Sequence, residues 1–325
     1  GAFETLTGGS LCQPRRVRRQ QASWRASMAV NARLFGIGPG LRLAVPGQLV
    51  HSLALYGALE GLCLGAEVHL LEGLRPDRQA AALRARQIAL LYATPAQLQA
   101  MLAGVPSWPA LRTVLIGGAK LDAPLRASLM RAAPQVEIRE FYGAAETSFV
   151  TLSAPGDDPA SVGQAYPGVN IRVDAGGEVW VQSPYLFDGY AGPDPGGARW
   201  QDGWLSVGEY GQMSPGGLIL RGRAGRMVTI AGQNVFPEEI EGFLALQPGV
   251  HRAAVLALPD PARGHVLIAH VMGDDVQEAA LMQALRARPG PMRGPRRLIW
   301  RADWPELASG KTDLSALLAE GASWR

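Results

Sequence analysis

The residues with the clearest chemical potential lie in two glycine-rich turns, each of which follows a β-like run. The first turn reads GGAK from Gly117, and the second reads YGAAET from Tyr142. Glycine allows a ligand to approach the backbone closely, and a carboxylate such as Glu146 can hold Mg²⁺ beside phosphate groups. Both turns therefore favour a nucleotide site, and a tight strand-to-helix turn is the purely structural alternative for each.

A third segment, residues 5–17, reads TLTGGSLCQPRRV and joins a Gly/Ser-rich turn to basic residues. The backbone N–H groups of such a turn can cradle phosphates. It is not a Walker loop, because the GK[ST] ending is absent. A polar loop before a helix is the alternative, and the sequence leaves both interpretations open.

Lysine is scarce in this chain. Of 31 basic residues, Lys120 and Lys311 are the lysines, and arginine supplies the rest. Lysine is a compact point charge whereas arginine is bulky and planar, so a lysine kept in this background suits a site that needs that shape. Chance survival is the alternative. His51, within VPGQLVHS, is a weaker candidate, since a lone histidine on an apolar helix is more often a core residue.

Alternating strand-like and helical runs must position these residues in the first half of the chain. Strands are predicted at 41–45, 66–71, 88–93, 111–117 and 136–141, and helices near 50–63, 76–86, 95–103 and 122–132. This alternation predicts an α/β fold with a doubly wound parallel sheet. Ligands of such sheets bind at the carboxyl ends of the strands, where both glycine-rich turns lie.

The pattern changes twice farther along the chain. Residues 151–222 show short β runs with Gly/Pro turns, which predicts a small β subdomain after an α/β core at 1–150. Residues 223–325 predict a smaller C-terminal α+β domain, with strands at 255–258, 266–271 and 297–301, a capping box at 275–278 and a helix at 312–318. Between them, Gly225 can act as a pivot and Pro237 suits the first turn of a helix.

Composition bounds the class of protein. The 325 residues are 47% hydrophobic and 18% charged, which is enough for about two folded domains. The net charge of +3 is small, and the arginine clusters at 15–19 and 293–301 are interpreted as solvated surface, not as a nucleic-acid site. The two cysteines form no CxxC and indicate neither zinc nor a disulfide framework. No signal peptide is recognised, and residues 49–68 are interpreted as a buried helix, not a membrane span, with the cytoplasm as the expected compartment.

Several of these segments, in this order, are similar to the motifs of the AMP-forming adenylating enzymes: acyl-CoA synthetases, peptide-synthetase adenylation domains and luciferases. The matches are IGGAKL at 116–121, FYGAAET at 141–147, DGWLSVGE at 202–209, GRAGR at 222–226 and SGKTD at 309–313. The resemblance covers nearly the whole chain, but relatives normally carry a long additional N-terminal region. The chain is therefore identified as an N-terminally shortened member, and edge strands exposed by the shortening predict a homodimer.

The resemblance implies a role for each candidate residue. Tyr142 would stack on adenine, Glu146 would bind Mg²⁺, and Lys311 would contact the substrate carboxylate and the α-phosphate. Further residues expected at the nucleotide are Thr7, Gly9 and Ser10 of the phosphate loop, Gly117, Gly118, Ala119, Gly143 and Thr147, and Glu209 at the ribose with Arg223 beside it. His51 would border the acyl pocket, Gly232 would line the thiol tunnel, and Gly225 would be the hinge of a mobile C-terminal domain. The departures from the family pattern are Leu11, Cys12, Arg15 and Arg16 in the phosphate loop, Ala145, Glu209 and Gly225.

The implied reaction is AMP-forming. ATP would activate a small carboxylic acid as an acyl-adenylate, and the acyl group would pass to the thiol of CoA or of the phosphopantetheine of an acyl carrier protein. The small or apolar pocket segments favour a hydrophobic aryl or aliphatic acid. The altered phosphate loop keeps a second hypothesis open, a weakly active or inactive relative that serves as a nucleotide-binding or scaffold protein. A dinucleotide-binding oxidoreductase is disfavoured, because no GxGxxG follows the first strand.

Overall fold

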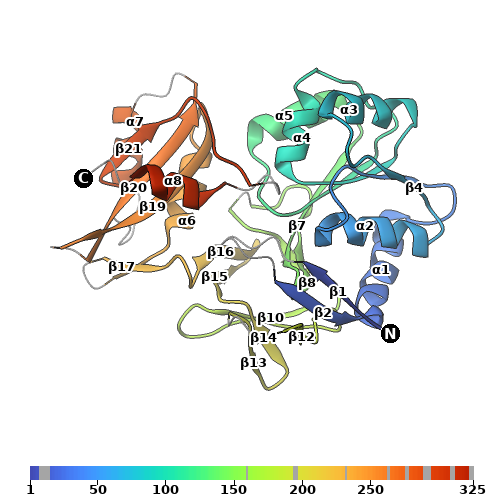
Figure 1. Ribbon diagram of the computed structural model, residues 1–325, viewed down its shortest axis with the longest axis horizontal. Coiled ribbons are helices and arrows are strands. Elements are labelled where there is room, and N and C mark those ends of the chain that lie inside the picture. The colour runs from blue at the N-terminus through green and yellow to red at the C-terminus, as the bar shows by residue number, and fades with distance from the viewer. Residues whose placement is uncertain are drawn as a thin grey trace. The chain divides into compact units, whose positions relative to one another are not determined.

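The computed structural model describes residues 1–6, 15–158, 160–192, 197–230, 233–261, 264–274, 278–287, 294–307 and 312–321 (Figure 1). The chain divides into two compact units. Unit 1 is Gly1–Val207 with Met213–Ile219, and unit 2 is Gly208–Gln212 with Leu220–Arg325. The chain therefore passes between the units at 207/208, just before β15 (Glu209–Ser214), and at 212/213 and 219/220, within the hairpin of β15 and β16 (Gly217–Arg223). The domain boundary expected after residue 222 stays a prediction.

Unit 1 is built on a sheet with the strand order β4-β3-β5-β6-β7-β8-β9. The strands are β3 (Arg42–Val45), β4 (Glu67–Leu70), β5 (Leu90–Ala93), β6 (Thr113–Ile116), β7 (Glu137–Ala144), β8 (Ser148–Leu152) and β9 (Gln164–Ala165). The first five in that order pair in parallel, as expected. The sheet is nevertheless mixed, because β8 and β9 are antiparallel. The short connection from β7 to β8 can close a hairpin but not a parallel crossover.

The helices of unit 1 cover both faces of this sheet, so the predicted doubly wound arrangement is confirmed. They are α1 (Gln21–Phe35), α2 (Ser52–Cys63), α3 (Pro76–Ala85), α4 (Pro95–Leu102) and α5 (Ala123–Ala132). Helix α3 contacts α4, and α4 contacts α5, over a core that includes Leu98 and Leu129 (Figure 1). Helix α2 packs with α1 and against β5, where a Cβ at Gly57 would meet the ring of Tyr92.

The N-terminal hairpin was not expected. Strands β1 (Ala2–Leu6) and β2 (Arg16–Gln20) pair with each other, and β2 also pairs with β12 (Gly189–Tyr190). Along β2, Val17 and Arg19 are buried while Arg16 and Arg18 are not. The interpretation of the first arginine cluster as solvated surface is therefore wrong at Arg19, which is 1% exposed. Burial at every second residue is typical of a strand, but the pattern was not recognised because one of the buried residues is an arginine.

A separate small sheet follows in unit 1, as predicted for this region. Its order is β10-β11-β14-β13, formed by Asn170–Val173, Val179–Gln182, Trp204–Ser206 and Arg199–Gln201.

Within the described residues, no helix has the length and apolar character required to cross a membrane. The stretch 49–68, interpreted above as one buried helix, forms α2 and the start of β4.

Unit 2 has the α+β composition expected of the C-terminal region. Its elements are β17 (Val228–Ile230), β18 (Gln233–Val235), α6 (Pro237–Ala245), β19 (Val250–Asp260), β20 (Gly264–Gly273), α7 (Glu278–Arg286), β21 (Arg297–Trp300) and α8 (Leu314–Gly321). The sheet order is β19-β20-β21, and α6 packs on β19. Arg226 ties the start of the unit together, because its guanidinium donates to Glu241 at 2.7 Å and to the Val255 carbonyl at 2.8 Å.

A buried polar cluster joins α1, α2 and β5 around Glu60, which is fully buried. Its carboxylate accepts hydrogen bonds from Tyr92 Oη at 2.5 Å, Asn31 Nδ2 at 2.8 Å and Tyr56 Oη at 3.1 Å. Burial raises the pKa of Glu60 to about 7, against the opposing effect of these hydrogen bonds. The cluster therefore holds a carboxyl group that takes up a proton more readily than it does in water.

The variant Glu60→Gln tests this effect. The folded pKa of about 7 lies above the ordinary value of 4.5, so the folded state binds the proton more tightly than the unfolded chain. The resulting stabilisation is complete below the unfolded pKa and is lost as pH rises through the folded pKa. We expect wild type to lose about 3 kcal/mol of unfolding free energy from this group between about pH 4 and pH 8. Urea unfolding across that range should show a smaller loss for Glu60→Gln, and equal losses would contradict the assignment.

Candidate functional site

The two glycine-rich turns lie side by side in the structure, because β6 and β7 are neighbouring parallel strands. Gly117 directly follows β6, and a Cβ there would overlap the ring of Phe141 on β7. Gly118 has a φ of 90°, a conformation that glycine tolerates best. Lys120 Nζ donates to the Ser161 carbonyl at 2.8 Å. Packing thus accounts for the buried Gly117 and backbone conformation for Gly118, and Gly118 and Ala119 are exposed.

The second turn joins β7 to β8 and carries the candidate metal ligand. At Gly143 a Cβ would overlap the Ser148 carbonyl of β8, so only glycine fits this position. The hydroxyl of Thr147 accepts a hydrogen bond from the Ala144 amide at 2.9 Å, which closes the turn. Tyr142 lies near the end of β7, the last of the five parallel strands, and is partly exposed. The turn is therefore rigid, and it presents an aromatic ring before a carboxylate.

Glu146 is 9% exposed, and its surroundings come from distant parts of unit 1. Tyr190 Oη donates to Glu146 Oε1 at 2.8 Å, and the Phe187 amide donates to the Glu146 carbonyl at 2.9 Å. No group of three or more His, Cys, Asp or Glu side chains that could hold a metal occurs in the described part of the chain. A single carboxylate fits Mg²⁺, which is often bound through one or two carboxylates together with substrate phosphates and water.

A second pair of candidate residues meets within unit 2. Arg223 Nε donates to Glu209 Oε1 at 2.6 Å across the β15–β16 hairpin. The Glu209 side chain is 6% exposed, whereas that of Arg223 is 49% exposed. The structure thus brings together Glu209, expected at the ribose, and Arg223, expected to help hold the nucleotide beside it. Gly225 follows in a turn in which a Cβ would meet no atom within 4 Å, so packing does not require glycine there.

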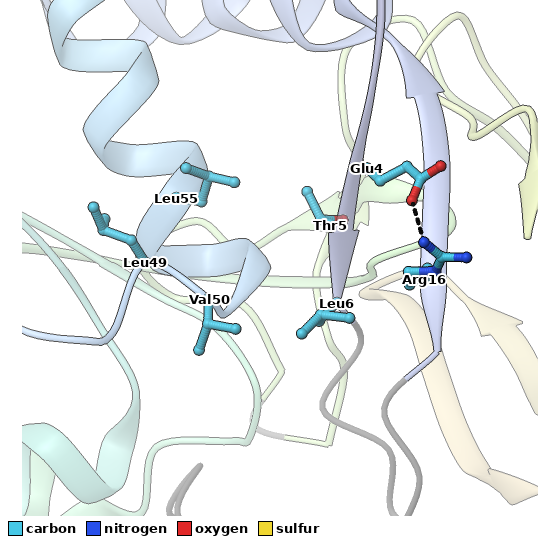
Figure 2. Close-up of a pocket in the computed structure, with 7 residues that line it drawn as sticks. All are labelled: Glu4, Thr5, Leu6, Arg16, Leu49, Val50 and Leu55. Carbon is cyan, nitrogen blue, oxygen red and sulfur yellow. Dashed lines mark ion pairs between the residues drawn. The ribbon is translucent and has the colours of Figure 1, made fainter. Parts of the chain in front are cut away.

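A cavity of about 240 Å³ lies between the N-terminal hairpin and the start of α2 (Figure 2). The side chains that line it are Glu4, Thr5, Leu6, Arg16, Leu49, Val50 and Leu55. One wall is apolar, and Glu4 and Arg16 form an ion pair at 3.4 Å on the other side, as Figure 2 shows. His51 forms an isolated parallel β-bridge with Leu6 and is partly exposed, but it does not line this cavity. The structure gives no contact that tests its expected place at an acyl pocket.

Five of the expected site residues cannot be located. Thr7, Gly9 and Ser10 of the phosphate loop, Gly232 and Lys311 lie outside the described residues. Conversely, the sequence interpretation missed Tyr190 and Arg19, whose side chains bond to Glu146 and to the carbonyl of Ala145. Val17 and Arg19 are two positions apart, which is the spacing of side chains on one face of a strand, and this spacing was the available signal for a buried arginine. No local signal linked Tyr190 to Glu146, because the two residues are 44 positions apart.

Comparison with known proteins agrees with this geometry. The AMP-binding enzyme family matches residues 2–191, and the AMP-binding enzyme C-terminal domain matches residues 239–311. The uncharacterized acyl-CoA ligase YhfT of Bacillus subtilis is 32% identical over 94% of this chain and 66% of its own length. Amide bond synthetase McbA from Marinactinospora thermotolerans is 25% identical with a TM-score of 0.81, over 98% of this chain and 69% of its own. ATP-bound MatB from Rhodopseudomonas palustris is 23% identical with a TM-score of 0.82, over 98% and 67%.

The chain therefore spans about two-thirds of the length of these relatives. The first family match alone covers more than half of the 325 residues, from the N-terminal hairpin to the segment that contacts Glu146. The fold, the two glycine-rich turns and the family matches agree, and the chain belongs to the AMP-binding family of adenylating enzymes.

Proposed function

We propose that this chain activates a carboxylic acid with ATP and passes the acyl group to a thiol. The observation that carries the proposal is the turn at the end of β7, where Tyr142 and the buried Glu146 stand on one rigid hairpin beside the glycine turn after β6. In doubly wound sheets, ligands bind at the carboxyl ends of such strands. Membership of the AMP-binding family supports ATP as the nucleotide.

In this proposal the substrate carboxylate attacks the α-phosphorus of ATP, and pyrophosphate leaves to give an acyl-adenylate. Tyr142 stacks on adenine, and the turn at Gly117, Gly118 and Ala119, of which Gly118 and Ala119 are exposed, borders the nucleotide, with Gly143 and Thr147 shaping the adjoining turn. Glu146 would hold Mg²⁺, which supplies positive charge at the phosphates. A thiol then attacks the acyl carbon, and AMP leaves with the bond electrons.

The proposed contributions of unit 2 are positive charge and a ribose contact. Glu209 is already buried and paired with Arg223, so its carboxylate is pre-oriented before nucleotide arrives. We assign Lys311 the charge on the substrate carboxylate and α-phosphate, Gly232 the thiol tunnel, and Gly225 the pivot between half-reactions. The proposed pivot gains support from Gly225 standing in a turn free of packing constraints.

The proposed acceptor is CoA, with a carrier-protein phosphopantetheine as the other thiol. YhfT, a relative of this chain, is named as an acyl-CoA ligase, whereas the similarly folded McbA is named as an amide bond synthetase. The acceptor therefore differs among proteins of this fold. We propose a thiol here because YhfT has the higher sequence identity to this chain, 32% against 25% for McbA. A hydrophobic aryl or aliphatic acid is proposed as substrate, and His51 as a residue of its pocket, because the predicted pocket segments carry small or apolar residues.

The two lysines offer a matched test of catalysis. We expect Lys311→Ala to lower the rate of pyrophosphate release about 100-fold or more, since it removes a charge that stabilises the transition state. The comparison variant Lys120→Ala removes the other lysine, whose amine bonds to a backbone carbonyl of unit 1, and should lower the rate much less than Lys311→Ala does. Pyrophosphate release with a panel of acids, ATP and Mg²⁺ measures both. Equal rates for the two variants would refute the role of Lys311, and ATP binding without turnover by wild type would favour a binding protein.

Variants of Glu209 test the ribose contact. We expect Glu209→Gln to weaken ATP binding about tenfold, because a neutral amide is a poorer acceptor than a carboxylate and no longer forms an ion pair with Arg223. Glu209→Asp keeps the charge one methylene shorter and should weaken binding less. Calorimetric titration with a non-hydrolysable ATP analogue measures affinity, and thermal unfolding controls for stability. Unchanged affinity in Glu209→Gln would exclude the contact.

A further inference from the structure

The turn that carries Glu146 is enclosed by one segment of the chain, residues 185–190. The Phe187 amide donates to the Glu146 carbonyl at 2.9 Å, and Tyr190 Oη donates to Glu146 Oε1 at 2.8 Å. Backbone and side chain of Glu146 are therefore both held from the same neighbouring segment. Among the described residues, Oε1 is the carboxylate oxygen of Glu146 for which a hydrogen bond is found.

Arg19 also holds the Glu146 turn and the segment beside it. Its guanidinium donates to the Ala145 carbonyl and, at 3.0 Å, to the Tyr185 carbonyl. It also lies over the ring of Trp24, 5.4 Å from the centroid. Burial lowers the pKa of Arg19 to about 10, so the group is still charged at neutral pH. One guanidinium thus fixes both the residue before Glu146 and the start of the segment that holds it.

This arrangement is costly, which argues that it does more than fill space. Arg19 Nε is buried without a hydrogen-bond partner, and a buried donor left unpaired destabilises the folded state. A buried charge is also expensive to desolvate, and apolar residues of similar volume often replace such groups without loss of stability. What the arginine supplies in return is a hydrogen bond that holds the backbone directly before Glu146.

Tyr190 is placed to orient the carboxylate. Its ring packs edge-on against Phe187, with the ring centroids 5.2 Å apart. The Arg15 guanidinium lies over the Tyr190 ring, 5.7 Å from the centroid of that ring. The Tyr190 hydroxyl donates to the Glu146 carboxylate at 2.8 Å. Tyr190 thus contacts both the candidate metal ligand Glu146 and Arg15 of the expected phosphate loop.

We propose that Tyr190 is a positioning residue for Glu146: its hydrogen bond to Oε1 holds the carboxylate in the orientation in which Oε2 can bind Mg²⁺. The proposal rests on the proposed function, because it assumes that Glu146 binds the metal of the nucleotide. Partners that orient a metal ligand in this way commonly change metal affinity 10- to 100-fold when they are removed. A hydrogen bond that serves stability alone would leave metal affinity unchanged.

Tyr190→Phe removes the hydroxyl and keeps the ring on Phe187. The matched control is Tyr185→Phe, which removes a hydroxyl of the same segment that donates to the Pro167 carbonyl at 2.6 Å and does not touch Glu146. Glu146→Gln serves as the reference for loss of the ligand. Binding of Mn²⁺ with a non-hydrolysable ATP analogue, followed by water-proton relaxation, reports metal affinity without turnover. The Mg²⁺ dependence of pyrophosphate release and thermal unfolding are measured beside it.

We expect Tyr190→Phe to raise the Mn²⁺ dissociation constant and the half-saturating Mg²⁺ concentration about tenfold. Tyr185→Phe should leave both unchanged, while the two Phe variants unfold at similar temperatures. If both Phe variants bind Mn²⁺ like wild type and Glu146→Gln does not, the positioning role is wrong and the proposed function stands. If Glu146→Gln also binds Mn²⁺ like wild type, Glu146 is not the metal ligand and the inference falls with that assignment.

Discussion

The buried charge of Arg19 is the interaction on which the arrangement of unit 1 around Glu146 depends. A guanidinium can be kept out of water only where acceptors surround it, and its acceptors here include the carbonyls of Ala145 and Tyr185. These come from the turn after β7 and from the segment before β12, while Arg19 itself belongs to β2. Both hydrogen bonds therefore form only when the three segments meet, and they link the N-terminal hairpin to the turn that carries Glu146.

Arginine has this structural role elsewhere in the chain, which gives meaning to the scarcity of lysine. Arg226 bonds to both oxygens of Glu241 and to the Val255 carbonyl, and Arg223 bonds to the buried Glu209. At Arg19 and Arg226 the planar guanidinium serves several acceptors at once, which a lysine could not do in the same geometry. Lys120 instead donates to a single carbonyl. At these two sites the structure therefore explains why arginine is used.

The sequence predicted most of the fold, because hydrophobic period and glycine placement are local properties. The five parallel strands and helices α2–α5 follow from alternation, and Pro237 begins α6 as expected. The antiparallel end of the main sheet was missed, since the short β7–β8 connection reads equally well as a strand-to-helix turn. The N-terminal hairpin was missed because burial of Arg19 depends on carbonyls more than a hundred residues away.

The sequence by itself determined the family, the parallel part of the sheet and the glycines at 117 and 143, because each is written in residues close together in the chain. Only the tertiary structure decided what surrounds Glu146. Tyr190, Phe187 and Arg19 reach it from segments that pair through β2 and β12, and no spacing in the sequence encodes that pairing. A hydrogen bond between residues far apart in the chain requires the intervening fold to bring two atoms within about 3 Å, and periodicity carries no such distance. The sequence singled out Glu146 as a candidate, and the fold shows which side chain bonds to it.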